Sequence, residues 1–229
     1  MTICTCICWP DAVCRAWDRA RALDAALRSR VEERVDALPP GLRDHIHRVV
    51  EIAQELAVRH DLAPELAALG ALAHDVARAM PGSELLRRAA ELGLPVGLVE
   101  RRVPVLLHGP VGAELLRRED GLQNSALYQA VYWHTSGHPG LDKLGRVVFL
   151  ADKLDPQKIG RYPYLPLLQQ LAFQDLDQAM LEFTTREITS LVAQGEMVHP
   201  AMVDTRNSLL AGHANNKPLE AERASNSQR

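Results

Sequence analysis

Histidine and aspartate lie side by side in the most apolar part of this sequence, where they could hold a metal ion. His74 and Asp75 follow the apolar run 69–73 and precede Val76 and Ala77. A buried carboxylate is costly unless a cation lies beside it. A divalent metal is such a cation, and imidazole nitrogen with carboxylate oxygen is a common ligand set. Because adjacent helix positions are about 100° apart, these two side chains can share one ion only where other ligand-bearing helices face them.

Other histidines and acids occupy comparable places at the ends of apolar stretches. His45 begins a helical stripe of apolar residues and lies on its inner face, and Asp152 ends the apolar run 147–151. His108 and His134 each follow an apolar stretch and precede a loop. These positions predict that side chains far apart in the sequence meet in the helical interior.

Each of these residues also has a simpler interpretation when it is taken alone. A buried histidine can be a hydrogen-bonded core residue, Asp75 can pair with Arg78, and Asp152 can meet Lys153 or Arg146. Four histidines and two aspartates in the same kind of setting together favour a metal site. The remaining histidines lack that setting, and His47 is predicted to be on the surface and His60 to interact with a helix dipole; the set is His47, His60, His138, His199 and His213.

The elements that must position these side chains are predicted to be helices. Apolar residues recur with helical spacing, and Pro and Gly mark the breaks. A helix that is apolar nearly all round, as 64–80 is, is expected to be central. We expect helices over 12–38, 42–60, 64–80, 84–92, 109–118, 122–133, 144–152 and 167–194, with loops at 135–141 and 156–166.

Composition supports an all-α fold and excludes two classes of partner. The chain of 229 residues is 47% hydrophobic but only 4% aromatic, which favours helix packing over a β-sandwich. A net charge of -3 argues against an electrostatic nucleic-acid binder or an RNA-associated adaptor. No apolar run approaches the roughly 20 residues of a membrane span, so we expect no membrane partner.

The two ends of the chain differ from its middle. All four cysteines lie at the start, so no disulfide framework can join distant segments, which is typical of a cytoplasmic protein. We expect an N-terminal extension and leading helix over 1–40, with the cysteine-rich start a mobile extension or an upstream translation start. The main domain is expected over 41–211, and a disordered polar tail over 212–229. The cysteines are Cys4, Cys6, Cys8 and Cys14.

Several stretches of the sequence together resemble a known family. The order His, His-Asp and Asp on a helical bundle resembles the HD-domain superfamily of metal-dependent phosphohydrolases, and within it the YqeK-type branch of bacterial symmetrical diadenosine tetraphosphate hydrolases. The resemblance covers most of the chain, about 42–210. It rests on His45-x-x-x-Val49-x-x-x-Ala53, Ala73-His74-Asp75-Val76-Ala77, His108-Gly109-x-x-Gly112-Ala113, His134-Thr135-Ser136-Gly137, Leu150 to Pro156, Asp175-Leu176-Asp177 and His199-Pro200.

The resemblance implies an HD-domain helical bundle and a role for each matching residue. It implies metal ligands at His45, His74, Asp75 and Asp152, with iron as the ion. It assigns catalysis to Asp75, His108 and His134. It implies nucleotide contacts, mainly to phosphates, from Arg78, His108, His134, Thr135, Asp152 and Lys158, and base or ribose contacts from the stretch 195–200, at Gly195, Val198, His199 and Pro200.

The sequence also departs from the pattern of this family at two phosphate-contacting positions. Leu42 stands where the family usually has Arg, with Arg43 beside it, and Arg78 replaces the usual Lys after His-Asp. Lysine and arginine are not interchangeable where geometry matters. The departures leave the ligand set intact and concern fine substrate preference.

The implied ligand set has a definite chemistry. Two histidines and two aspartates without thiolate suit Fe, Mn, Co or Zn. An ion held by these four ligands lowers the pKa of a water toward about 7 and polarises a phosphorus centre. The implied reaction is hydrolysis of dinucleoside tetraphosphates, cutting diadenosine tetraphosphate symmetrically to two ADP by a metal-activated water. The substrate is the expected partner, and a homodimer is compatible with the sequence.

Two other functions remain open at the level of sequence. The same scaffold could serve another HD-type nucleotide phosphatase or a cyclic-dinucleotide phosphodiesterase. It could also be a non-catalytic nucleotide-binding module, although such a module need not retain a costly buried aspartate.

Overall fold

The computed structural model describes residues 25–216, with the backbone alone for 213–216. Over these residues the chain consists of helices and connecting turns with no strand, which confirms the predicted all-α class. No helix in this range is both long and apolar enough to cross a membrane. The predictions for the cysteine-rich start and for residues 217–229 lie outside the described residues.

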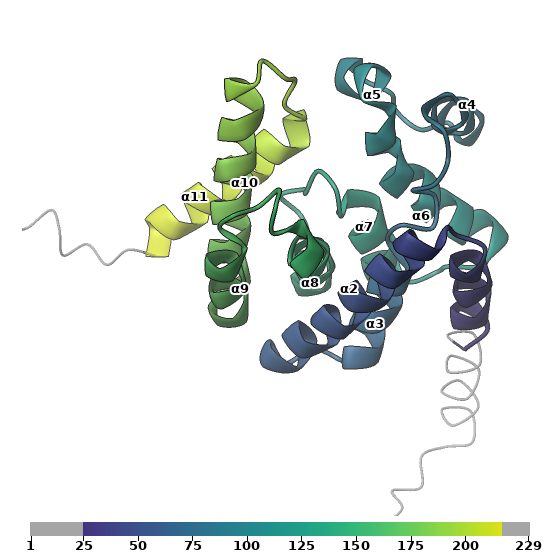
Figure 1. Cartoon of the computed structure of the whole chain (residues 1–229), viewed down its shortest axis with the longest axis horizontal. Helices are drawn as coiled ribbons and strands as arrows, with labels where there is room; N and C mark the ends of the chain where they lie inside the picture. The colour runs from purple at the N-terminus through teal and green to yellow at the C-terminus, as the bar shows by residue number, and fades with distance from the viewer. Residues whose placement is uncertain (1–24, 217–229) are drawn as a thin grey trace, which may run out of the picture.

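The helices follow one another with short connections (Figure 1). A first helix over 25–36 packs into the core through Leu27, Val31 and Val35. The others are α2 (Pro40–Arg59), α3 (Pro64–Ala73), α4 (Gly82–Leu92), α5 (Leu98–Arg102), α6 (His108–Glu119), α7 (Ser125–Trp133), α8 (Lys143–Lys153), α9 (Leu165–Gln174), α10 (Leu176–Ala193) and α11 (Pro200–Asn216), with 3-10 turns η1 (Pro104–Leu107) and η2 (Pro156–Lys158).

Helix α8 lies at the centre of the bundle and carries Asp152 near its end. It packs against α2, α3, α7 and α10 (Figure 1). Nearly all of its residues are buried, as expected for a helix that is apolar on most sides. The side chain of Asp142 caps its start by accepting from the amide of Gly145. Asp152 therefore reaches the interior from a fixed central helix.

Helix α3 packs closely against α8 and ends earlier than its apolar pattern predicts. A Cβ on Gly70 would lie 2.9 Å from the side chain of Val148, so glycine permits this close packing. The helix was predicted to run to residue 80 but ends at Ala73. His74 Nδ1 donates to the carbonyl of Ala71 at 2.5 Å, and in a continuing helix that carbonyl would accept from the amide of Asp75. Residues 74–80 form turns instead.

The C-terminal part of the structure differs most from prediction. One long helix was expected over 167–194, but the chain forms α9 and α10 with a break at Asp175. Asp175 has an extended backbone, and its carboxylate accepts from the amides of Asp177 and Gln178, which starts a new helix. Gly195, with a φ of 70°, ends α10 as predicted.

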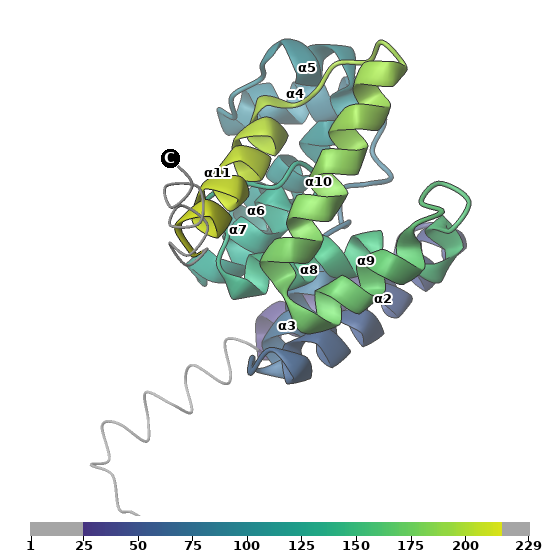
Figure 2. The same cartoon turned by 90° about the vertical axis from the view of Figure 1, so that its left-hand side faces the viewer.

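Helix α11 was not predicted, and it lies beside α10 (Figure 2). It continues to Asn216, past residue 212, where the polar tail was expected to begin. The pair formed by α10 and α11 covers one side of the bundle and comes near α5 through an ion pair between His199 and Glu100, whose Nε2 and Oε1 atoms are 2.9 Å apart. A cavity lies between α10, the segment that leads into α11, and the end of α8.

Candidate metal centre

Three of the four predicted histidines are held in the same way at the ends of helical segments. His74 follows α3, His108 follows η1, and His134 follows α7. Each donates its Nδ1 proton to the carbonyl three residues earlier: His74 to Ala71 at 2.5 Å, His134 to Val131 at 2.8 Å, and His108 to Val105. A neutral imidazole has one N–H, so this bond leaves Nε2 of each ring with a free lone pair.

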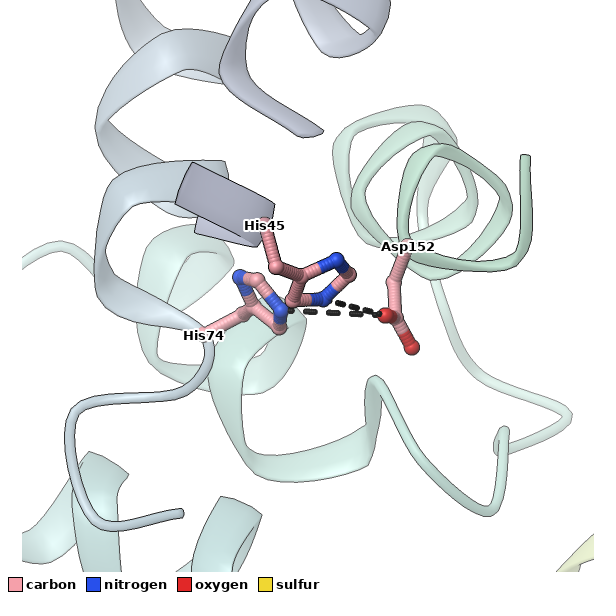
Figure 3. Close-up of side chains that lie close together, drawn as sticks. All are labelled: His45, His74 and Asp152. Carbon is pink, nitrogen blue, oxygen red and sulfur yellow. Dashed lines mark hydrogen bonds and ion pairs between the residues drawn. The ribbon is translucent and has the colours of Figure 1, made fainter. Parts of the chain in front are cut away.

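His45 is held differently but with the same result. It lies within α2, and its Nδ1 donates to Oδ2 of Asp155 at 2.5 Å. Its Nε2 then points to Oδ1 of Asp152, 3.1 Å away. Figure 3 shows Nε2 of His45 and of His74 directed together at Asp152, from α2, the end of α3 and α8 respectively. The Nε2 atom of His74 is 3.8 Å from Oδ1 of Asp152.

The carboxylate of Asp75 is in contact with Nε2 of three histidines, His74, His108 and His134. Its Oδ1 lies 3.0 Å from Nε2 of His108 and 3.4 Å from Nε2 of His134, while its Oδ2 lies 3.4 Å from Nε2 of His74. The Nε2 atoms of His108 and His134 are only 2.8 Å apart. Lone pairs on nitrogens and carboxylates at such distances repel unless a proton or a cation lies among them.

This donor set fits a divalent metal ion. Among the described residues, Nε2 of His74 is the buried side-chain nitrogen that has no hydrogen-bond partner. Ligand atoms of His45, His74 and Asp152 lie within 4.8 Å of one another, and so do those of His74, Asp75 and His134. Nitrogen and oxygen donors without thiolate match iron, manganese, cobalt or zinc. The predicted convergence of these residues in the helical interior is confirmed.

The charges around the two carboxylates keep them ionised. Burial favours the neutral acid at Asp75, but the neighbouring histidines, His74 first, hold its pKa well below the usual range. Burial also opposes ionisation of Asp152, and Lys153 and Lys158 outweigh it and lower its pKa. Both carboxylates are therefore anionic at neutral pH and available to a cation.

The pKa values of His74 and His134 shift in opposite directions because burial and the nearby carboxylates balance differently at the two rings. Burial opposes protonation of His74, but Asp75 and Asp152 raise its pKa. Burial lowers the pKa of His134 to about 4. His134 is therefore uncharged at neutral pH, with its proton on Nδ1.

Two lysine side chains, those of Lys153 and Lys158, pair with the carboxylate of Asp152. The ammonium of Lys153, which is 6% exposed, donates to Oδ2 of Asp152 at 2.6 Å and to the carbonyl of His134 at 3.0 Å. Burial lowers the pKa of Lys153. Lys158 donates to Oδ1 of Asp152 and, at 2.6 Å, to its carbonyl. Sequence reasoning considered Lys153 only as a neighbour of Asp152; its place inside an apolar helix was the signal for a buried amine.

The simpler pairings considered from the sequence are not formed, apart from that with Lys153. Arg146 pairs with Asp177 instead of Asp152, beside a separate cavity. The guanidinium of Arg78 makes no hydrogen bond or ion pair with any residue of the described range and faces the cavity. His47 is exposed, as predicted, and Nε2 of His60 interacts with the carbonyl of Ala172 at 2.7 Å.

A cavity of about 680 Å³ extends from the metal centre toward α10 and α11. Its polar part contains the cations Arg78, Lys158 and Arg161, together with Thr135, whose Oγ1 is 3.0 Å from Nε2 of His134. Its apolar wall is formed by Val103, Val105, Leu106, Tyr162, Phe183, Leu191, Met197 and Met202. Cations beside an apolar wall suit a ligand with both phosphates and rings, although Lys158 and Arg161 also pair with Asp152 and Glu187.

The other predicted nucleotide-binding residues lie near this cavity to different degrees. His199 lines it together with Glu196 and Met197, whereas Gly195, Val198 and Pro200 belong to the same segment without lining it. Leu42 lines the cavity, while Arg43 donates to the carbonyl of Asp36 at 3.2 Å, away from it. Arg43 therefore does not replace the cation that position 42 lacks.

Comparison with known proteins finds a matching family model and several relatives of similar sequence. A model of the HD domain family matches residues 42–157. The symmetrical bis(5'-nucleosyl)-tetraphosphatase of Bacillus subtilis is 32% identical over 185 residues, which are 79% of this chain and 98% of that protein. The enzyme of the same name from Halalkalibacterium halodurans is 29% identical over 175 residues, 75% and 92% of the two chains.

A solved structure also resembles this one. It is the crystal structure of a predicted HD superfamily hydrolase involved in NAD metabolism from Clostridium acetobutylicum, with a TM-score of 0.75 and 24% identity. The match covers 80% of this chain and 96% of that one, and it supports the fold alone.

Proposed function

The chain belongs to the HD domain family and to its group of symmetrical bis(5'-nucleosyl)-tetraphosphatases, and we propose that it hydrolyses diadenosine tetraphosphate to two ADP. One observation of the structure carries this function. Four imidazole Nε2 atoms and two carboxylates converge beside a cavity that is lined by cations and by apolar side chains. The named activity of the similar proteins is the second support.

A divalent metal ion is expected at this centre. His45, His74, Asp75 and Asp152 would hold it, and iron is the proposed ion, with manganese, cobalt or zinc as alternatives. When bound, such an ion supplies Lewis acidity toward a phosphoryl oxygen and lowers the pKa of a water. The other contributions to the reaction come from residues of the chain.

The cations of the cavity would bind the polyphosphate. A dinucleoside tetraphosphate carries several negative charges, and Arg78, Lys158 and Arg161 line the polar part of the cavity. Arg78 has no partner in the described range, so it needs to break no ion pair to bind phosphate. Stabilising charge on the transferred phosphoryl group is the main requirement in phosphoryl transfer.

Histidine nitrogens beside Asp75 would accept the proton that the attacking water releases. Water attacks phosphorus, the bond to the bridging oxygen breaks, and the two halves leave as ADP with release of a proton. Nε2 of His108 and Nε2 of His134 lie 3.0 Å and 3.4 Å from Oδ1 of Asp75, and one of these two imidazoles would accept that proton. The hydroxyl of Thr135 lies 3.0 Å and 3.3 Å from these two nitrogens and can orient them or the substrate.

The apolar wall would hold an adenine ring. Met197, which is exposed, provides flexible apolar surface in this wall, and the buried rings of Phe183 and Tyr162 pack behind it among the lining residues. The segment 195–200 would contact the ribose. In this segment His199 lines the cavity, and Gly195, Val198 and Pro200 determine the path of the backbone.

Product analysis tests the proposed function. Purified protein is assayed for metals, incubated with diadenosine tetraphosphate, and the nucleotides are separated by chromatography. ADP alone supports symmetrical cleavage, whereas AMP with ATP contradicts it. Release of phosphate from nucleoside monophosphates or cleavage of a cyclic dinucleotide would favour another HD-type enzyme, and binding without products a non-catalytic module. Asp75→Asn is expected to lose both the metal and turnover.

A further inference from the structure

His45 is the one predicted metal ligand whose ring is held by a charged side chain. His74, His108 and His134 use a carbonyl of their own segment, three residues earlier. His45 lies inside α2, where backbone carbonyls are engaged in the helix. Its Nδ1 bonds to Asp155, which is 110 residues away along the chain. The orientation of this ring therefore depends on a residue that is not a neighbour.

Asp155 is itself fixed by three further donors. Arg48 donates from Nε to Oδ1 at 2.8 Å and from Nη2 to Oδ2 at 2.9 Å, and the amide of Gln157 donates to Oδ1 at 3.1 Å. The Asp155 side chain is 2% exposed. Two charge-assisted hydrogen bonds from one guanidinium hold the carboxylate in one orientation.

The positions of these residues tie together two elements of the metal centre. Arg48 follows His45 by three positions on α2, so both lie on the same side of that helix. Asp155 lies just beyond the end of α8, the helix that carries Asp152. The Arg48–Asp155 pair thus joins α2 to the end of α8 at the place where Nε2 of His45 is 3.1 Å from Oδ1 of Asp152.

We propose that Asp155, held by Arg48, is the positioning residue for His45 in the metal centre. As an ionised acceptor it keeps the proton of His45 on Nδ1, leaves Nε2 with a lone pair and directs that lone pair toward Asp152 and His74. A carboxylate behind an imidazole also makes the far nitrogen a better ligand. This role rests on the proposed metal centre and does not depend on which phosphate ester is hydrolysed.

Metal binding by single variants tests the role directly. Full-length protein stripped with a chelator is titrated with Co²⁺, and binding is followed by calorimetry and by the visible absorption of the bound ion. Loss of an outer partner of a metal-bound histidine typically weakens metal binding on the order of 10–100-fold. We expect that loss for Asp155→Asn, which keeps the size of the side chain but removes its charge, and a smaller loss for Arg48→Met. We expect Asp155→Glu to restore part of the affinity.

The chain offers a matched control in a second Arg–Asp pair. Arg146 pairs with Asp177 beside a separate cavity, and no metal ligand is in contact with that pair. Asp177→Asn and Arg146→Met should leave the Co²⁺ affinity and the absorption spectrum unchanged, although each also breaks an ion pair between helices. Circular dichroism of the stripped proteins checks that each variant is folded.

Several results would overturn the role. Asp155→Asn that binds Co²⁺ as tightly as the parent, with the same spectrum, would show that His45 needs no such partner. An equal loss in Asp177→Asn would make the effect one of general stability. If Asp155→Asn does not fold, Arg48→Met decides in its place, because the Arg48 side chain is 27% exposed and its loss is better tolerated. A parent protein that binds no Co²⁺ would overturn the metal centre as well, whereas a failure with diadenosine tetraphosphate alone would leave this role standing.

Discussion

The contact between the first turn of α6 and the last turn of α7 sets the distance between His108 and His134, and Gly109 permits it. A Cβ on Gly109 would lie 2.8 Å from the carbonyl oxygen of Tyr132 and 3.0 Å from that of Val131. Both oxygens belong to the backbone, so neither can rotate away. The Val131 oxygen also accepts the Nδ1 proton of His134. Gly109→Ala should therefore disturb the centre itself.

The size of the effect follows from this overlap. Carbon and oxygen atoms normally approach no closer than about 3.3 Å, so the two helix ends must separate by about half an ångström. Overpacking of this kind costs about 1–3 kcal/mol, and the better helix propensity of alanine returns about 0.5–1 kcal/mol. A net loss of about 1–2 kcal/mol corresponds to a fall in Tm on the order of 2–8 °C for a domain of this size. Misplacement by an ångström can cost about 100-fold in rate, so we expect on the order of a 10-fold loss of kcat.

Thermal unfolding of the metal-free protein and steady-state hydrolysis of diadenosine tetraphosphate measure the two effects. Gly41→Ala is the matched control, since Gly41 lies in the first turn of α2 and a Cβ there would meet no atom within 4 Å. It should leave turnover unchanged and stability equal or slightly higher. Gly109→Ala that proves as stable and as active as Gly41→Ala would refute the reasoning about the α6–α7 contact.

Three further predictions follow from the site. His108→Ala should keep the metal and lose on the order of 100-fold in kcat; metal-free His108→Ala protein, by elemental analysis, would make His108 a ligand. Arg78→Met should raise KM on the order of 10-fold without changing the metal affinity, as steady-state kinetics and Co²⁺ titration would show; an unchanged KM would remove Arg78 from the phosphate site. The pKa of Asp155 falls from 3.8 to about 2 on folding, so about 2 kcal/mol of stability is present above pH 4 and lost as the pH falls toward 2. Urea unfolding of the metal-free protein should show this loss, and Asp155→Asn a smaller one.

The fold could be predicted from the sequence wherever an apolar pattern alone determines a helix. The expected helices over 42–60, 84–92, 109–118 and 144–152 match α2, α4, α6 and α8 within a few residues at each end. The prediction failed where a polar side chain competes for backbone hydrogen bonds. His74 ends α3 early, and Asp175 separates α9 from α10. The spacing of apolar residues gives no information about side chains that compete for backbone hydrogen bonds.

The convergence of the histidines and aspartates was predictable from the sequence, but the side chains that orient them were not. His45, His74, Asp75 and Asp152 stand at the ends of apolar segments, and burial of a carboxylate required a cation. The partner of Nδ1 in His45 could not be predicted, because Asp155 reaches it through tertiary packing alone. Of the residues around the cavity near α10 and α11, only the stretch 195–200 was expected, through the family resemblance; helix α11, which contributes Met202, was not predicted.

The orientation of the histidines explains where the helices end. The last carbonyls of a helix have no partner within it, and His74 and His134 use such a carbonyl to place their Nδ1 proton, while His108 shares the Val105 carbonyl with its own backbone amide. Because each Nε2 must face the carboxylates, helix ends are needed at the centre, and α3, η1 and α7 all end there, at Ala73, Leu107 and Trp133. A histidine inside a helix has no free carbonyl, so His45 needs an acceptor from another element. Asp155, held by Arg48, supplies that acceptor for a histidine that lies within α2.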